Sequence, residues 1–439
     1  MIWDFFKKKA PKQSPGHQQS DSPHADDKKQ VRGKEVKVPI SFLQRLMPLA
    51  QLLSEQEIQQ LQVTSASFAP GAIVFNRGTE VESLAYLIKG KIFMEAGNGS
   101  GLEIDADTFK ALYPLSAGKL HYFTAIASSD VTVIYVPKAV LQPHQGTIAP
   151  LDNDLKTTVQ LKNNPFFNHF YRHFRQGELK IPTFPDIAIK LRKAIQQDRN
   201  ISDIVKIVNM DPVISARLIQ VVNSPAYRPM SPISNCLEAI NRLGLTTTRN
   251  LVTAFSMKNL AQSKNPAIKK AIQNCWLQSI KVSSIGHTLA QLTREVDPDE
   301  ALLAGLLHNI GALPILTFAD SLPPGSYQSV DIELCINEIQ GQIGSMILEE
   351  WEFPDNLKRI PQLSTDWFAS TTENINLNDI VLLAKYHSLL ASPTNKLPLL
   401  ITLPAFQKLG NQSLTPEMSL QILDDAKKQI TDTMSFFSS

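Results

Sequence analysis

The sequence predicts a multidomain α+β protein with a small β jelly roll in its N-terminal part and an all-α domain in its C-terminal part. Three observations lead to this prediction. The chain has 439 residues, which is too many for one ordinary domain. Residues 38–145 contain short β-branched and aromatic runs separated by Gly, Pro and Asn. Residues 180–439 contain helical patterns of about 10 to 25 residues each.

The composition limits the class of protein. The net charge of +2 gives no bulk attraction for nucleic acid, so we expect no nucleic-acid partner. Cys236, Cys275 and Cys335 are far apart and form no CxxC pair, so neither a disulfide framework nor a zinc site is predicted. No secretory signal is visible, because the lysines at 7–9 follow the apolar residues instead of preceding them. The prediction is a cytoplasmic protein.

Residues 1–37 are predicted to be a disordered N-terminal segment. Residues 10–37 are rich in Pro, Gln, Ser and charged residues and cannot bury enough surface to fold. Residues 1–9, MIWDFFKKK, place aromatics before three lysines. This segment could contact an anionic membrane surface, although a disordered terminus is the favoured interpretation.

The first folded domain is predicted over residues 38–145. It opens with a helical stretch at 49–62, LAQLLSEQEIQQLQ. The runs GAIVF, LAYLI, KIFME and VTVIYV follow, with turn residues between them. Short strands at this close spacing are typical of a small antiparallel barrel or jelly roll.

This domain resembles the cyclic-nucleotide-binding domain family. The matching positions are Phe68, Pro70, Gly71, Val74, Phe75, Gly78, Leu84, Tyr86, Leu87, Ile88, Gly90 and Lys91. The resemblance implies a phosphate site built from a Gly-Glu pair and a later Arg, in which an Arg fork and backbone N–H groups hold the anion. The corresponding stretch, residues 111–127, has no Glu after a Gly, and His121 stands about where the Arg belongs. Lys119 is the nearest cation, so a structural barrel is favoured, and Lys119 and His121 are the candidates for a non-standard nucleotide site.

A helical connector is predicted over residues 146–179. Its segment 160–175, QLKNNPFFNHFYRHFR, carries aromatic residues at helical spacing. The stripe consists of Phe166, Phe167, Phe170, Tyr171 and Phe174. We interpret it as the buried face of an interdomain helix; stacking on nucleic acid is the alternative.

The helical domain, residues 180–439, opens with amphipathic patterns and clear helix starts. Ser202 is the predicted N-cap of one helix, and Asp211-Pro212 opens the next with Pro at its first position. The long apolar stretch at 301–319 is interrupted by His308, Asn309 and Pro314, so we predict a buried helix followed by a turn.

This half resembles the HDOD family, whose members are relatives of the HD hydrolases. The motif residues are Asp211, Pro212, Arg217, Leu218, Asn223, Ser224, Ile233, Ala239, Ile240, Leu243 and Gly244. The segments GLLHNIGAL at 305–313 and G-x(6)-W-x-F-P at 344–354 also fit. The resemblance implies an all-helical fold in a bacterial signalling protein.

The resemblance also identifies where HD hydrolases bind metal, through a His, a His-Asp pair and a distant Asp. Those positions carry Gln278, His308-Asn309 and Lys385 here. Neutral amides are poor ligands for a site that activates water, and a protonated lysine offers no lone pair and repels a cation. We therefore predict no metal, no cofactor and no HD hydrolase reaction. His287 and His387 have no carboxylate at i±3 or i±4 and are interpreted as structural.

The predicted function is non-catalytic signal transduction through binding of the HDOD domain to signalling proteins. Two alternatives stay open. The first is a switch that binds a cyclic mono- or dinucleotide, with Lys119, His121 and Lys385 as the cations. The second is a residual metal-dependent phosphohydrolase that uses His308.

Overall fold

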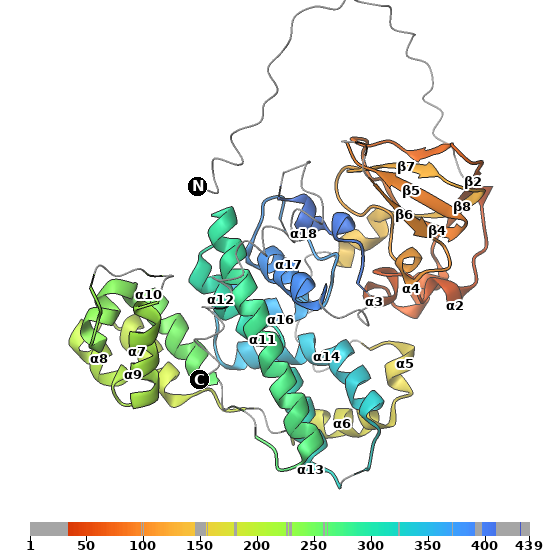
Figure 1. Ribbon diagram of the computed structural model, residues 1–439. Helices are drawn as coiled ribbons and strands as arrows, with labels where there is room; N and C mark the ends of the chain where they lie inside the picture. Colours follow the sequence, from red (N-terminus) through yellow and green to blue (C-terminus); the bar gives the residue numbers. More distant parts are fainter. Residues whose placement is uncertain are drawn as a thin grey trace, which may run out of the picture.

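The computed structural model describes residues 34–409 and residue 431, with gaps at 98, 100, 145–154, 156, 180–181, 225–226, 228–230, 258–259, 261, 324, 371 and 391–396. A β domain lies at one side of the molecule, and a helical body separates it from a small helical lobe at the other side (Figure 1). The segment 1–9 lies outside the described residues. Lys34–Glu35 already form a strand, so the regular structure begins before the predicted boundary at 38.

The β domain is a sandwich of two four-stranded antiparallel sheets, as predicted. One sheet has the order β1-β2-β8-β4 and the other β3-β7-β5-β6. The strands are β1 (Lys34–Glu35), β2 (Thr64–Phe68), β3 (Ile73–Phe75), β4 (Ser83–Lys89), β5 (Lys91–Glu95), β6 (Gly101–Asp105), β7 (Thr124–Ala127) and β8 (Val131–Pro137).

Both faces of β4 are buried, which explains its continuous apolar run. Ala85 and Leu87 face the second sheet in the sandwich core, together with Ile92 and Met94 of β5. Leu84 and the other side chains of its face pack instead against helices. At the β4–β5 turn Gly90 has φ +86°, and a methyl group there would overlap the carbonyl of Asp130, so only glycine fits.

Short helices flank the sandwich. They are α2 (Ile40–Leu43), α3 (Leu49–Leu52), α4 (Glu55–Gln59) and the 3₁₀ helices η1 (Phe109–Leu112) and η2 (Lys138–His144). The predicted helical stretch at 49–62 is thus two helices, because Ser54 and Glu57 form a capping box that starts α4 anew.

The connector contains α5 (Val159–Lys162) and α6 (Pro165–Arg175). Phe166, Phe167 and Phe170 are buried, and the rings of Phe166 and Phe170 pack on Phe318 of the helical body at 5.9 and 5.5 Å. The aromatic stripe is therefore a packing face, as predicted. Its buried rings are not accessible to nucleic-acid bases.

The helical domain divides into a lobe and a body. The lobe contains α7 (Asp186–Gln196), α8 (Ile201–Val208), α9 (Pro212–Val222) and the first half of α10 (Cys236–Ser256). The body contains α11 (Pro266–Thr293), α12 (Pro298–Leu307), α13 (Ala312–Ser321), α14 (Ser329–Glu350), α15 (Asp355–Lys358), α16 (Ile360–Leu363), α17 (Leu377–Leu390), η4 (Leu400–Thr402) and α18 (Pro404–Gln407). Helix α11 runs through the body and packs along α12 and α17 (Figure 1).

Capping side chains set the ends of the lobe helices. Asp211 caps α9 by accepting bonds from two backbone N–H groups, as predicted. The N-cap of α8 is Asn200 and not Ser202, because the Asn200 side chain accepts the N–H of Asp203 at 3.0 Å and the helix starts one residue before Ser202. Asn223 then clamps the following loop, since its amide exchanges two hydrogen bonds with the backbone of Ile233.

Helix α10 is broken at Gly244, where φ is 79° and ψ is 166°. Only glycine adopts this conformation readily. Thr248 caps the break by donating to the Gly244 carbonyl at 2.7 Å. The kink lies where α10 passes from the lobe to the body.

The stretch Pro298–Ser321 is long and apolar enough to cross a membrane, but 89% of its most apolar window is buried inside the protein. Helix α12 ends at Leu307 and α13 starts at Ala312, so a turn divides the stretch as predicted. The stretch therefore forms two helices of the protein core.

Candidate functional site

The four positions that the sequence resemblance matches to HD metal ligands lie along one seam of the helical body. Gln278 is on α11, His308 and Asn309 follow α12, and Lys385 is on α17. Three serines bond to the side chains or backbone carbonyls of these residues, and we call the whole set the polar seam. It consists of Gln278, Ser279, His308, Asn309, Ser364, Lys385 and Ser388.

Asn309 joins the turn after α12 to α11. Its side-chain oxygen accepts the hydroxyl of Ser279 at 2.5 Å, and its amide donates to the carbonyl of Cys275 at 3.0 Å. Both hydrogen-bonding groups of the amide are therefore engaged within the protein. An aspartate at this position could not donate the second bond.

His308 is buried and held as a neutral ring. Its Nδ1 lies 2.6 Å from the Gly305 carbonyl, which favours a proton on Nδ1. Burial, together with the nearby Lys385 ammonium, lowers the pKa of His308 to about 3. The ring is therefore uncharged at neutral pH.

Lys385 takes the place of an acidic ligand and is bound by neutral groups. Its Nζ donates to the Ser364 carbonyl at 2.7 Å and lies 5.2 Å from the centre of the Trp367 ring. The Ser364 hydroxyl in turn donates to the His308 carbonyl at 3.3 Å. Burial lowers the pKa of Lys385 to about 8.

Gln278 joins the seam to α17 from α11. Its amide Nε2 donates to the Ser388 hydroxyl at 2.8 Å, and that hydroxyl donates to the Lys385 carbonyl at 2.7 Å. The serine thus carries a bond from α11 to the backbone of α17.

These residues do not fit a divalent metal. In its hydrogen bond to Ser388, Gln278 uses an N–H donor, which cannot bind a metal. Lys385 places a positive charge where the HD enzymes have an anionic ligand. Within the described ranges no group of three or more His, Cys, Asp or Glu side chains could hold a metal ion. His308 is the single seam residue of a type that HD enzymes use as a ligand.

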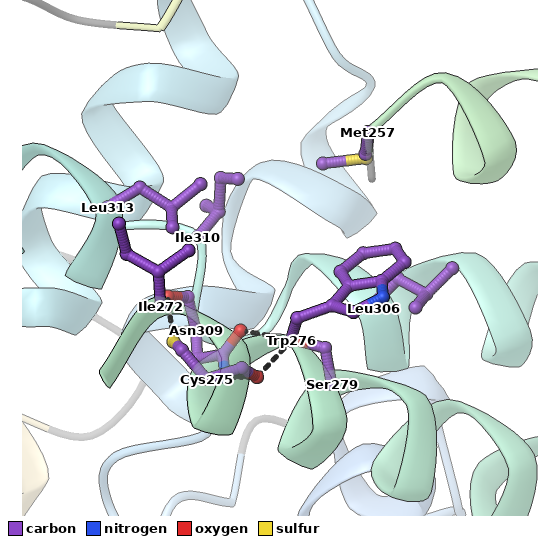
Figure 2. A pocket seen from close by; sticks show the side chains of 9 residues that line it. All are labelled: Met257, Ile272, Cys275, Trp276, Ser279, Leu306, Asn309, Ile310 and Leu313. Atoms are coloured by element: carbon purple, nitrogen blue, oxygen red, sulfur yellow. Dashed lines mark hydrogen bonds between the residues drawn. The ribbon is translucent and has the colours of Figure 1, made fainter. Parts of the chain in front are cut away.

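A cavity of about 30 Å³ lies beside the seam, between α11 and the α12–α13 turn (Figure 2). It is lined by Met257, Ile272, Cys275, Trp276, Ser279, Leu306, Asn309, Ile310 and Leu313. This volume has room for one or two water molecules and is far too small for a nucleotide. Burial raises the pKa of the Cys275 thiol to about 12, which keeps it unreactive.

A second polar cluster, not anticipated from the sequence, lies where the lobe meets the body. Asp299 accepts the hydroxyls of Tyr227 at 2.6 Å and Thr247 at 2.7 Å, and His287 Nε2 lies 3.8 Å from the same carboxylate. We call these four residues the Asp299 cluster. Burial lowers the pKa of His287, and Asp299 and Asp297 oppose that effect.

The prediction for His287 was therefore incomplete. The ring is buried and structural, but its carboxylate partner comes from α12 instead of from its own helix. The acidic run at 297–300 is also the start of α12. Asp297 does cap α12 by accepting the N–H of Glu300 at 2.8 Å, while Asp299 points into the cluster.

The two barrel candidates do not converge on a common site. His121 is buried and stacked on Phe75, with ring centres 3.9 Å apart. Burial and the nearby Lys138 lower the pKa of His121 to about 4, so the ring is neutral. Lys119 is exposed and pairs with Glu373 of the helical domain at 3.3 Å. Lys385, the third cation considered for a nucleotide, lies in the polar seam.

Comparison with known proteins agrees with this architecture. The HDOD domain model matches residues 181–365. A crystal structure from Shewanella amazonensis SB2B, which carries the provisional name metal-dependent phosphohydrolase, is 25% identical with a TM-score of 0.55. The match covers 64% of this chain and 100% of that one, so the helical part shares its fold.

Two further matches are more limited. An uncharacterized protein of Treponema pallidum is 24% identical over 193 residues, which is 40% of this chain and 36% of that protein, so the match spans about a third of that relative's length. The N-terminal domain matches the sensor domain of the transcriptional regulator DNR from Pseudomonas aeruginosa. That match has 18% identity, covers 24% of this chain and 79% of that one, and has a TM-score of 0.20.

Proposed function

Because residues 181–365 form an HDOD domain, we propose that this protein is a non-catalytic signalling protein that acts through protein–protein contacts of its helical domain. One observation carries the proposal. Gln278, Asn309 and Lys385 replace three of the four metal ligands of the HD enzymes, and each is bound to a serine or a backbone carbonyl inside the seam.

Hydrolysis of a phosphodiester in an HD site depends on metal-activated water. The polar seam offers instead two amides, a neutral imidazole and an ammonium group, and the amides and the ammonium group join four helical segments. A domain that has lost its ligands and retained its fold can act by binding. The proposed location is the cytoplasm, and the free thiols of Cys236, Cys275 and Cys335 support it.

The proposal predicts that purified full-length protein contains far less than one equivalent of Mn, Fe, Zn or Mg by mass spectrometry. It should also fail to hydrolyse cyclic and linear phosphodiesters above the buffer rate. The triple variant Gln278→His, Asn309→Asp, Lys385→Asp is the matched control, because it restores the ligand types and should bind metal where the wild type does not.

Two results together would overturn the proposal. One is one or two tightly bound metal ions per wild-type chain. The other is a hydrolytic activity that disappears in His308→Ala while circular dichroism shows the fold intact.

A further inference from the structure

We propose that the β domain regulates the polar seam through one contact, made by its residues 113–122 with residues 364–370, Glu373 and α18 of the helical domain. This inference rests on the proposed function, because it describes how the binding domain would be controlled. The partner of this face of the β domain is thus a part of the same chain.

Aromatic and charged pairs make the first part of the contact. The ring of Tyr113 lies 6.1 Å from that of Phe368, and burial raises the pKa of Tyr113. Lys119 Nζ lies 3.3 Å from a carboxylate oxygen of Glu373, in an exposed pair at the rim. An exposed pair adds little stability and mainly sets the orientation of the two domains.

The second part is the close approach of Gly118 to Gln407 at the end of α18. A methyl group on Gly118 would overlap the side-chain oxygen of Gln407, so the glutamine can pack here only because residue 118 has no side chain. The hydroxyl of Tyr122 donates to the Gln407 carbonyl at 3.2 Å. Gln407 itself is 7% exposed and donates its amide to the Ile401 carbonyl at 3.0 Å.

This contact is poised to open. The side-chain oxygen of Gln407 is buried and accepts no hydrogen bond among the described residues. Burying a polar atom without a partner costs free energy, so the docked state is less stable than its close packing suggests.

The same loop that the barrel touches also closes the polar seam. Phe368 is adjacent in sequence to Trp367, whose ring lies 5.2 Å from Lys385 Nζ. Ser364, four residues before Phe368, gives its carbonyl to Lys385 and its hydroxyl to the His308 carbonyl. The loop is therefore fixed at one end by the seam and at the other by the barrel.

The loop is internally tied, so it should move as a unit. The N–H of Phe368 donates to the Asp366 carboxylate at 2.9 Å, and Ser364 bonds back to the Pro361 carbonyl at 2.9 Å. A shift of Phe368 that follows release of the barrel must therefore change the Trp367–Lys385 contact. Packed elements transmit such shifts because the interior cannot deform continuously.

The test uses full-length protein labelled with 5-fluorotryptophan. Gly118→Val places two methyl groups against Gln407 and should open the contact, whereas Ser67→Val at an exposed position of β2 is the control. We expect Gly118→Val to shift the fluorine resonance of Trp367 and leave that of Trp351 unchanged. Amide exchange at residues 364–370 and 399–409 should become about tenfold faster.

Tyr122→Phe is a second variant, needed because Gly118→Val could disturb the fold of the barrel itself. It removes only the hydroxyl that donates to the Gln407 carbonyl, so we expect the same changes in the fluorine resonance and in amide exchange, with smaller size. The inference fails if exchange at 399–409 accelerates while the Trp367 resonance and residues 364–370 stay unchanged. It also fails if neither variant changes any of these signals. Neither readout involves metal or an external partner, so a failure here is separate from a failure of the proposed function.

Discussion

Removal of the Asp299 carboxylate should destabilise the helical domain more than any change at an exposed acidic residue. In Asp299→Ala the hydroxyls of Tyr227 and Thr247 lose their acceptor, and His287 loses its only carboxylate contact among the described residues. A fully buried hydroxyl left without a partner costs about 1–3 kcal/mol, and these two hydroxyls are partly buried. We therefore expect the free energy of unfolding to fall by roughly 2–4 kcal/mol.

Asp299→Asn separates charge from hydrogen bonding. The asparagine oxygen can accept one hydroxyl and its amide can donate to the other, so only the attraction to His287 is lost and the cost should be roughly 1 kcal/mol. Burial and the Asp299 charge raise the pKa of Tyr227, so its hydroxyl remains a donor throughout.

The assay is urea unfolding followed by far-UV circular dichroism, in which the helices dominate. Asp203→Ala is the control, because Asp203 forms an i,i+3 pair with Lys206 at the surface and should cost at most about 0.5 kcal/mol. A loss smaller than about 1 kcal/mol in Asp299→Ala would contradict this prediction, since it would mean that the two hydroxyls find other partners at no cost.

Three further predictions follow from the geometry. Gly244→Ala should lower the free energy of unfolding by about 1–3 kcal/mol through backbone strain alone, since a methyl group there would meet no atom within 4 Å. Urea unfolding measures this loss. Gly286→Ala inside α11 is the control and should be near neutral, because the nearest atom to its new methyl group would be 3.4 Å away. Carbon NMR of labelled lysine, with the signal assigned by Lys385→Met, should show that Lys385 titrates near pH 8 instead of 10.5. Because the unfolded chain then holds this proton more tightly than the folded chain, the free energy of unfolding should rise, relative to Lys385→Met, as the pH increases from about 8 to 10.5. His308, with a pKa lowered to about 3, should show no imidazole titration between about pH 5 and 8 by NMR. Only the unfolded chain binds this proton in that range, so the free energy of unfolding should fall as the pH drops below about 6.5. His308→Gln should remove this part of the pH dependence.

The sequence predicted the two domain types because both leave local signals. Turn glycines such as Gly90 and capped helix starts such as Asp211-Pro212 are decided by residues close together in the chain. The replaced ligand positions were also readable, because the residue types themselves exclude metal chemistry. Where two local signals competed, as at Asn200 and Ser202, the wrong N-cap was chosen.

Contacts between distant segments could not be predicted in the same way. His287 and Asp299 lie on consecutive helices, and no periodic pattern places them face to face. Ser279, Ser364 and Ser388 are not distinctive in the sequence, and they form these hydrogen bonds only when four helical segments meet. The contact of Gly118 with Gln407 joins positions in different domains, where a glycine is not distinctive on its own.

The polar seam also constrains how this protein could evolve. Asn309→Asp alone would set a carboxylate oxygen against the Cys275 carbonyl, which now receives a hydrogen bond from the amide. Lys385→Asp alone would remove the donor to the Ser364 carbonyl and add a buried acid without a metal to neutralise it. Each single change toward an HD ligand type is therefore unfavourable on its own, because it removes a donor that a buried carbonyl oxygen now uses. The residues of the polar seam depend on one another, so a substitution at one of them should be tolerated only together with a change at its partner.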